Sequence, residues 1–508
     1  MARRILVAIV CLVAVLSAAA QQDSIAMRYA GLITEEGLRE HLSVLASDAY
    51  EGREVGSRGE KMATAYIMEQ FKGYGIPPIA GAESKGLLPD GYRQEFPVVL
   101  ARNGGIRMTV NGKPYRFLKD YFYFRETLPA DLKVAEVMLV SGLTAGGMRL
   151  GGGGKVTLLW EEGDKDPPAP FLDLATLGKM VKGTGVEVLL VVEPSAAGLM
   201  ERYGPMMEQG RMRLGGTDQG TKVEDGPQVM VITPELAEAI VAGSGLKKKK
   251  ALKEAANKRV ILKVPVSFTG KGVEEQLTGQ NVLAYVEGGD KKDEIVVVTA
   301  HLDHVGVQDG EVYNGADDDG SGTVAVMGMA EAFAKAKADG HGPRRSMLFM
   351  AVSGEEKGLF GSRWYTDHPV FPLDSTVADL NIDMIGRVDS THDGRDRYVY
   401  VIGSFRLSRE LGDIVEMQNE RYTKLALDYT YDAEDDPNRF YYRSDHYNFA
   451  KHGIPVAFFF NGVHEDYHGP YDEVDKIRFD LLRERTLLVY YTAWELANRD
   501  RRPAVNGD

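Results

Sequence analysis

Imidazole and carboxylate side chains recur in the second half of the chain, where apolar runs of strand type end or a helix begins. The carboxyl ends of parallel strands meet at one edge of an α/β sheet, and ligands bind there. Histidine nitrogens together with several carboxylates suit zinc. The pattern therefore predicts one metal-binding crevice. The polar segments are His301-Leu302-Asp303-His304, Gly315 to Gly322, Ser353 to Glu356, Asp383, and Asn461 to His468.

Each of these residues has a simpler interpretation when it is taken alone. Asp318 could be a turn or N-cap residue, Glu355-Glu356 a solvated surface, and His301 a core histidine. Asp383 is harder to explain in this way, because it lies between Ile382 and Met384 near the end of an apolar strand. A buried carboxylate needs a partner charge or a metal. The repetition at several strand ends favours a shared site.

The acidic run Asp317 to Asp319 is not a calcium loop of the EF-hand type, because its carboxylates are adjacent and the twelfth position is Gly328. Two histidines and three carboxylates are too many for one four-coordinate zinc with an open position. They fit two metals that share a carboxylate and lie about 3.5–4 Å apart.

Alternating apolar runs and helix-type segments predict the elements that would position these residues. The pattern from residue 273 predicts an α/β fold with a mixed, mostly parallel central sheet covered by helices on both faces. Residues 99–272 have short β-like runs between glycine clusters and predict an inserted β-rich domain. The predicted helices are 36–48, 61–74, 323–338, 407–421 and 479–498, and the predicted strands of the sheet are 295–300, 347–352, 377–384, 398–402 and 454–460.

Composition limits the class of function. The net charge is -14 at pH 7, which argues against a nucleic-acid partner. The lysine run 247–250 is expected to be a solvated helix face. Cys11 is the one cysteine among 508 residues, so disulfides and thiolate zinc sites are excluded. Any metal must be bound through histidine and carboxylate side chains.

Residues 1–20 have the pattern of a secretory signal peptide, with Arg3 and Arg4 before an apolar stretch and Ser17-Ala18-Ala19-Ala20 at its end. A membrane anchor or a buried N-terminal helix is the alternative. Cleavage would remove Cys11, and the later chain has no apolar run long enough to span a bilayer. The mature protein is expected in the periplasm or outside the cell, without stable membrane insertion.

The motifs HLDH, GADDDGSG, SGEEKGLFGS, NIDMIGR, RSDHYNFAKHGIP and DYH resemble those of the secreted di-zinc aminopeptidase family. That family also includes glutamate carboxypeptidases and the transferrin receptor ectodomain. The resemblance covers residues 36–75 and about 275–508. Residues 99–272 resemble the protease-associated domain inserted in such enzymes, by their position in the chain and by their short β-like runs between glycine clusters. The implied domains are a signal peptide at 1–20, a peptidase domain at 21–98 and 273–508, and the insert at 99–272.

The resemblance implies roles for individual residues and two zinc ions per chain. Asp318 would bridge both zincs, and Glu355 would be the general base of a water-mediated hydrolysis. Three adjacent carboxylates stand where the family often has Asn beside the bridging Asp, which could shift metal preference or bind an extra cation. The remaining implied roles are His301 and Asp383 on the first zinc, Glu356 and His468 on the second, Asp303 orienting His301, Tyr467 donating to the oxyanion, and Arg443 near the substrate.

The resemblance favours an exopeptidase that removes N-terminal residues from peptide substrates. A carboxypeptidase is an alternative, since Arg443 and Arg387 could hold a terminal carboxylate. A glutaminyl cyclase on the same fold is less favoured, because relatives of that kind resemble this set with one zinc. A non-catalytic receptor-like scaffold is the third alternative, and the complete set of ligand positions argues against it.

Overall fold

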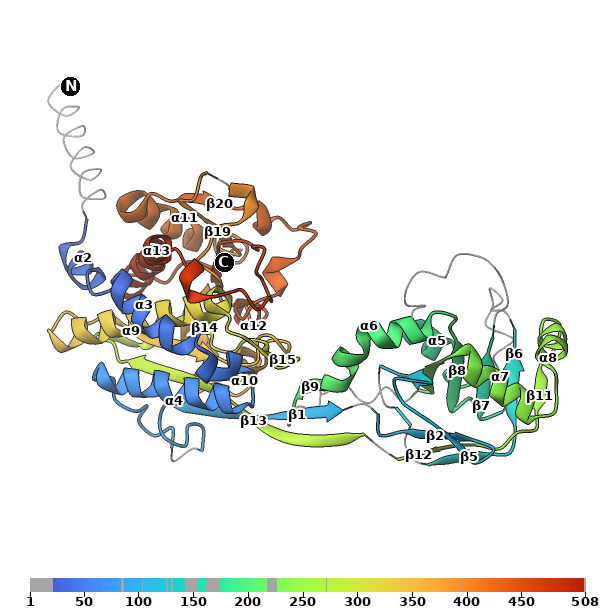
Figure 1. Cartoon of the computed structure of the whole chain (residues 1–508). Helices are drawn as coiled ribbons and strands as arrows, with labels where there is room; N and C mark the ends of the chain where they lie inside the picture. Colours follow the sequence, from blue (N-terminus) through green and yellow to red (C-terminus); the bar gives the residue numbers. More distant parts are fainter. Residues whose placement is uncertain are drawn as a thin grey trace, which may run out of the picture. The chain divides into compact units, whose positions relative to one another are not determined.

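The computed structural model describes residues 22–506 except 84–85, 103, 125–126, 129–130, 142–153, 161–173, 217–225, 271 and 393 (Figure 1). Val98–Leu277 form one compact unit, and the chain on both sides of that segment forms a second unit. The expected signal peptide, residues 1–20, lies outside the described residues. None of the helices in the described part combines the length and the apolar character needed to cross a bilayer.

A mixed sheet forms the centre of the second unit. Its four middle strands run parallel, because β14 pairs in parallel with β17 and β18, and β18 pairs in parallel with β21. β13 and β19 join this parallel group in antiparallel fashion. The order is β20 (Ala426–Asp428), β19 (Tyr398–Ile402), β21 (Val456–Phe460), β18 (Thr376–Ile382), β14 (Lys291–His301), β17 (Arg345–Val352), β13 (Val273–Val286), β1 (Arg93–Arg102) and β9 (Arg211–Leu214). β9 pairs with the part of β1 that belongs to the unit Val98–Leu277. The predicted fold class and the predicted strands are confirmed.

Helices cover both faces of this sheet, which explains why β17 and β18 are buried along their whole length. Side chains alternate between the faces: Val296 and Val298 belong to one apolar core, and Ile295 and Val297 to the other. The first core is covered by α3 (Glu35–Leu45), α4 (Arg58–Gly73), α9 (Gly322–Ala338), α11 (Arg409–Gln418) and α13 (Phe479–Asn498), and the second by α10 (Phe360–Asp367) and α12 (His446–Ala450).

The unit Val98–Leu277 contains helices as well as the β-structure expected for the insert. Its six-stranded sheet has four adjacent parallel strands and its second sheet has four strands. The parallel strands are β6 (Val137–Val140), β7 (Val156–Leu159), β8 (Val188–Val192) and β10 (Gln228–Ile232), and the helices are α5 (Leu174–Val181), α6 (Ala196–Gln209), α7 (Pro234–Gly243) and α8 (Lys248–Ala255). The lysine run 247–250 is exposed, as predicted.

Candidate metal centre and active site

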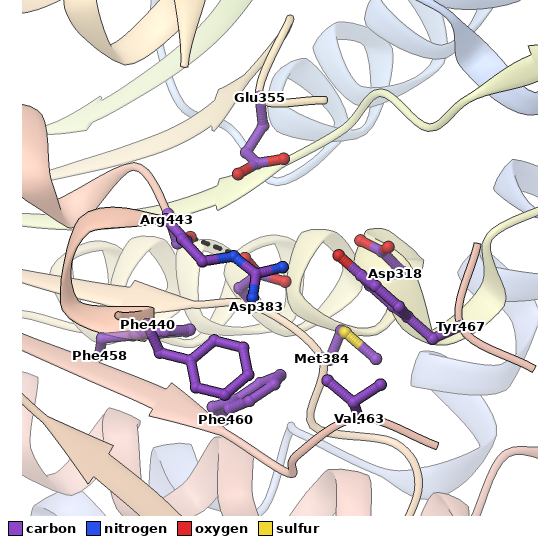
Figure 2. A pocket seen from close by; sticks show the side chains of 11 residues that line it. Asp318, Glu355, Asp383, Met384, Phe440, Arg443, Phe458, Phe460, Val463 and Tyr467 are labelled. Atoms are coloured by element: carbon purple, nitrogen blue, oxygen red, sulfur yellow. Dashed lines mark hydrogen bonds between the residues drawn. The ribbon is translucent and has the colours of Figure 1, made fainter. Parts of the chain in front are cut away.

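The polar segments predicted from the sequence meet at the carboxyl ends of the parallel strands. His301 is the last residue of β14, Asp383 directly follows β18, and Glu355 lies three residues beyond β17. Asp318 lies in the turn that leads into α9, and His468 lies in the loop after β21. The fold therefore brings side chains that are far apart in sequence into one pocket, part of which is drawn in Figure 2.

Asp318 lies between two histidines, one at each carboxylate oxygen. Its Oδ1 is 3.3 Å from Nε2 of His301, and its Oδ2 is 3.2 Å from Nε2 of His468. The carboxylate is almost completely buried. A carboxylate that turns its two oxygens toward two different imidazoles has the geometry of a ligand shared by two metals.

On the Oδ1 side, the first group of donors consists of His301, Asp318 and Asp383. Nε2 of His301 lies 3.5 Å from Oδ1 of Asp383. Ser444 donates a hydrogen bond to the other oxygen of Asp383 at 2.7 Å. One oxygen of Asp383 is thus held by the protein, and the other faces the imidazole.

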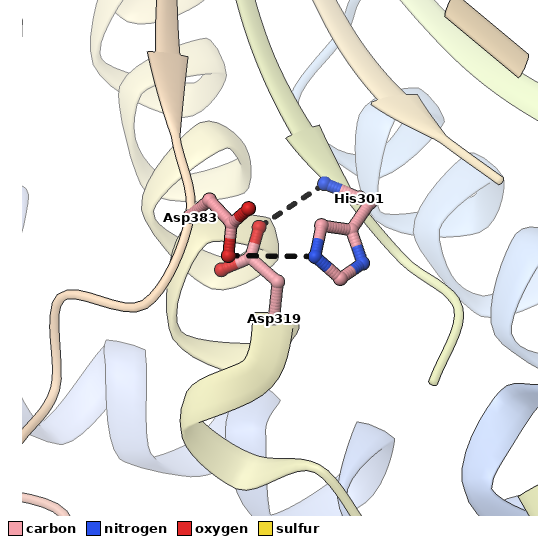
Figure 3. Close-up of side chains that lie close together, drawn as sticks. All are labelled: His301, Asp319 and Asp383. Carbon is pink, nitrogen blue, oxygen red and sulfur yellow. Dashed lines mark hydrogen bonds and ion pairs between the residues drawn. The ribbon is translucent and has the colours of Figure 1, made fainter. Parts of the chain in front are cut away.

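Asp319 lies beside this group, but its carboxylate accepts hydrogen bonds from backbone nitrogens (Figure 3). Its Oδ2 accepts a hydrogen bond from the backbone nitrogen of His301, and its Oδ1 accepts from those of Gly322 and Met384. Both oxygens are therefore occupied by protein donors. Asp319 fixes the ends of β14 and β18 relative to the start of α9.

Asp317 faces other protein groups, with one of its oxygens in a hydrogen bond and the other beside a histidine. Its Oδ1 accepts from the backbone nitrogen of Gly386 at 2.6 Å, and its Oδ2 lies 3.2 Å from Nε2 of His464. These partners explain the unusual run of three adjacent carboxylates. The outer two support the loop, and the middle one faces the pocket.

On the Oδ2 side of Asp318, the second group contains Glu356, His468 and His304. Oε2 of Glu356 is 3.0 Å from Nε2 of His468, and Oε1 of Glu356 is 3.0 Å from Nδ1 of His304. The sequence motif HLDH contains His304, but the sequence analysis assigned it no role. Its position three residues after His301 was the signal that could have identified it.

Several donor atoms in these groups are buried and have no hydrogen-bond partner. They include Nε2 of His301, Oδ2 of Asp318 and Oε1 of Glu356. Buried polar atoms are almost always paired, so unpaired donor atoms gathered in these two groups indicate missing partners. Imidazole nitrogens and carboxylate oxygens suit zinc, and the residues present fit such a centre.

Electrostatics at the second group also favour a cation. Burial opposes a charged His468, but the carboxylates of Asp318 and Glu356 outweigh it and raise the pKa of His468 to about 10. Burial and Asp318 would raise the pKa of Glu356, but His304 and His468 outweigh them and lower it to about 2. A metal would take the place of the proton on His468, so metal binding here should release protons.

Glu355 lies beside the first group, with its Oε2 4.0 Å from Nε2 of His301. Its backbone nitrogen donates to Oδ1 of Asp303 at 3.2 Å. Burial raises the pKa of Glu355 well above its usual range; His301 opposes the shift and Glu356 adds to it. A raised carboxyl pKa in a metal-binding pocket is the property expected of a general base.

Asp303 contacts His301 mainly through its backbone. Nδ1 of His301 lies 3.0 Å from the carbonyl oxygen of Asp303 and 3.8 Å from its carboxylate. The nearer orienting group is therefore the carbonyl, and not the carboxylate that the family resemblance implies. The carboxylate instead accepts the hydrogen bond from the Glu355 backbone.

Tyr467 and Arg443 both line the pocket. The Tyr467 ring stacks on His468 with centroids 3.9 Å apart, and burial, together with the carboxylate of Asp318, raises the pKa of its hydroxyl. The phenol is therefore a hydrogen-bond donor.

Arg443 is exposed, with its guanidinium 4.8 Å from the Phe440 ring centre. Arg387, the other cation considered for a carboxylate, is paired with Asp466 at 2.9 Å.

An apolar wall lines the side of the pocket opposite the carboxylates (Figure 2). Nothing in the sequence marks this wall, because Phe458 and Phe460 lie in strand β21 and have the pattern of core residues, and Phe440 lies in a separate short turn. The wall gives the pocket a surface for an apolar group next to the metal-binding groups. Its residues are Met384, Phe440, Phe458, Phe460 and Val463.

Known proteins share this site-bearing region. Residues 281–493, which carry the site, match the model of peptidase family M28. Aminopeptidase YwaD from Bacillus subtilis is 27% identical over 275 residues, which cover 51% of this chain and 52% of the relative. Leucine aminopeptidase 1 from Trichoderma harzianum is 30% identical over 229 residues, 43% of this chain and 55% of the relative. The matches thus span about half the length of these curated relatives.

Solved structures resemble the whole chain. An aminopeptidase from Aneurinibacillus sp. strain AM-1 aligns with a TM-score of 0.54 and 19% identity, over 95% of this chain and 98% of that one. The zinc aminopeptidase BSAP from Bacillus subtilis aligns with a TM-score of 0.53 and 18% identity, over 93% and 98%. These likenesses support the predicted zinc exopeptidase fold.

Proposed function

We propose that the protein is a zinc-dependent aminopeptidase that removes N-terminal residues from peptides with two zinc ions per chain. The position of Asp318 between His301 and His468 is the observation that carries this proposal. His301, Asp318 and Asp383 would hold one zinc, and Asp318, Glu356 and His468 the other. Bound zinc supplies Lewis acidity, which polarises a carbonyl group and lowers the pKa of water.

The residues of the chain would handle the proton and position the substrate. Glu355 would accept a proton from the attacking water at its carboxylate and deliver it to the leaving amine. The hydroxyl of Tyr467 would donate a hydrogen bond to the developing oxyanion. The apolar wall would bind the side chain of the first substrate residue and keep water away from it.

Export and the role of the insert belong to the same proposal. Residues 1–20 would be removed as a signal peptide, and residues 99–272 would be a protease-associated-like domain inserted between the two parts of the peptidase domain. Mass spectrometry of the exported protein tests the first point. A mature chain that starts near Gln21 supports it, and an intact Met1 contradicts it.

A carboxypeptidase is the second candidate, because Arg443 is an exposed cation in the pocket and could pair with a terminal carboxylate. The names of the relatives favour the aminopeptidase. Two versions of one peptide separate the candidates: one acetylated at its N-terminus, the other amidated at its C-terminus. The zinc-loaded protein should shorten only the amidated peptide, from its free N-terminus. Shortening of only the acetylated peptide would establish the carboxypeptidase. Glu355→Ala protein purified in parallel controls for contaminating peptidases.

A further inference from the structure

His304 is a buried histidine without a hydrogen bond at either ring nitrogen. Its Nδ1 lies 3.0 Å from Oε1 of Glu356 and 3.7 Å from Oδ2 of Asp318, two of the orphaned carboxylate atoms of the second group. A polar ring in the protein interior is costly unless its nitrogens are paired. The unpaired nitrogen therefore points to a ligand shared with these carboxylates.

The local backbone leaves room for this ring. Gly315 has a positive φ of 54°, and a Cβ atom at that position would lie 2.4 Å from Cγ of His304. A side chain at position 315 would thus clash with the imidazole of His304. The loop before α9 is shaped to place His304 against the second group.

The donors around the second group lie close to the distances that separate the ligands of a zinc ion. Donor atoms of a tetrahedral zinc site, with bonds of about 2.0–2.2 Å, lie roughly 3.3–3.6 Å apart. Nδ1 of His304 lies 3.0 Å from Oε1 of Glu356 and 3.7 Å from Oδ2 of Asp318. Nε2 of His468 lies 3.0 Å from Oε2 of Glu356 and 3.2 Å from Oδ2 of Asp318. His304, Asp318 and Glu356 each offer one ligand atom, and these three atoms lie within 4.8 Å of one another.

We propose that His304 is a ligand of the second zinc, through its Nδ1 atom. This inference rests on the proposed two-zinc centre and adds a residue to it. The second position then has four protein ligands, as closed zinc sites do, whereas the first has three and keeps an open position. Glu355 lies beside His301 of the first group, so the proton acceptor is next to the position that remains open.

X-ray absorption spectroscopy of the zinc-loaded wild-type protein tests this directly, because it counts imidazoles around the metal. The proposal predicts three imidazoles for two zincs, and His304→Ala should reduce that number to two. Wild-type protein with two zincs but only two imidazoles would overturn the role of His304 and leave the two-zinc centre intact. Wild-type protein that cannot bind two zincs would overturn the centre and this inference together.

Zinc retention by His304→Ala, measured by competition with a chelator, gives a second readout. Loss of an outer-shell partner weakens metal binding by about 10–100-fold, and loss of a ligand should exceed about 100-fold for one of the two zincs. Unchanged affinity for both zincs would overturn the proposal. His446→Phe is the matched control, because His446 is equally buried but stacks on Phe458 at 4.7 Å. It should keep the wild-type imidazole count.

Discussion

The backbone nitrogen of Glu355 donates a hydrogen bond to the carboxylate of Asp303 at 3.2 Å. This bond joins the segment after β17 to the segment after β14, so it sets the distance between Glu355 and His301. The backbone carbonyl oxygen of the same residue accepts a hydrogen bond from Nδ1 of His301. One buried residue therefore positions both the proposed base and a proposed zinc ligand.

Asp303→Ala should lower kcat, because it removes the carboxylate that accepts from the Glu355 backbone, and should leave zinc affinity nearly unchanged, because the carbonyl that accepts from His301 remains. Asp303→Asn retains an oxygen acceptor and should have a smaller effect on kcat. Chelator competition and steady-state kinetics on both variants measure the two effects. Equal kcat values for wild type and Asp303→Ala at full zinc occupancy would contradict this positioning role.

Asp318→Ala should lose zinc from both positions, since Asp318 is the residue that faces both histidines. Elemental analysis after dialysis is the measurement. Asp317→Asn is the control: it retains an oxygen for the Gly386 backbone and should keep both zincs. An Asp318→Ala protein with two zincs would exclude the shared-ligand geometry.

Glu60 of α4 should make stability depend on pH. It is buried beneath the Glu355 loop and accepts a hydrogen bond from Ser353 at 2.6 Å. Burial, which outweighs that bond, raises the pKa of Glu60 to about 7. The folded state therefore holds a proton that the unfolded state has released between about pH 4.5 and 7, and the free energy of unfolding falls as pH rises through that interval.

Urea unfolding of zinc-loaded wild type and Glu60→Gln from pH 4.5 to 8 tests this effect. The contribution of Glu60 to the free energy of unfolding should fall by about 3 kcal/mol as pH rises through this range. The variant should lack that fall. Glu69→Gln, an exposed change on the same helix, is the control. A Glu60→Gln protein with the same pH slope as wild type would refute the prediction.

Arg443→Ala should raise KM for dipeptides with a free carboxylate, because it removes a cation that lines the pocket. A dipeptide is short enough to place its carboxylate there, and the charge-assisted pairing would be lost. The same dipeptides as amides should be affected less, and Arg443→Lys should retain part of the difference. A rise in KM of equal size for acid and amide substrates would show that Arg443 does not contact the carboxylate.

The strand-end pattern was sufficient to predict the α/β sheet and the polar segments that the structure brings together, whereas the choice of Asp318, Glu355 and Glu356 within those segments came from the family resemblance. The reason is that parallel strands deliver their carboxyl ends to one edge. Charged groups next to apolar runs stand out in a sequence, whereas apolar groups do not.

Other parts of the site depend on three-dimensional packing. Phe458 and Phe460 alternate along β21 like any buried strand residues, so nothing in their pattern marks a pocket wall. Glu60 reaches the Glu355 loop from almost three hundred residues away. Loop geometry also decides that the carboxylate of Asp303 accepts a hydrogen bond from the Glu355 backbone and lies farther from the His301 ring.

The most direct test of the proposed chemistry is the turnover of Glu355→Gln protein that carries two zincs per chain by elemental analysis. The substitution keeps the shape of the side chain and removes its ability to accept the proton. The account predicts that zinc content is retained and that kcat on an amidated peptide with a free N-terminus falls at least ~100-fold. A fully zinc-loaded Glu355→Gln protein with wild-type kcat would contradict it.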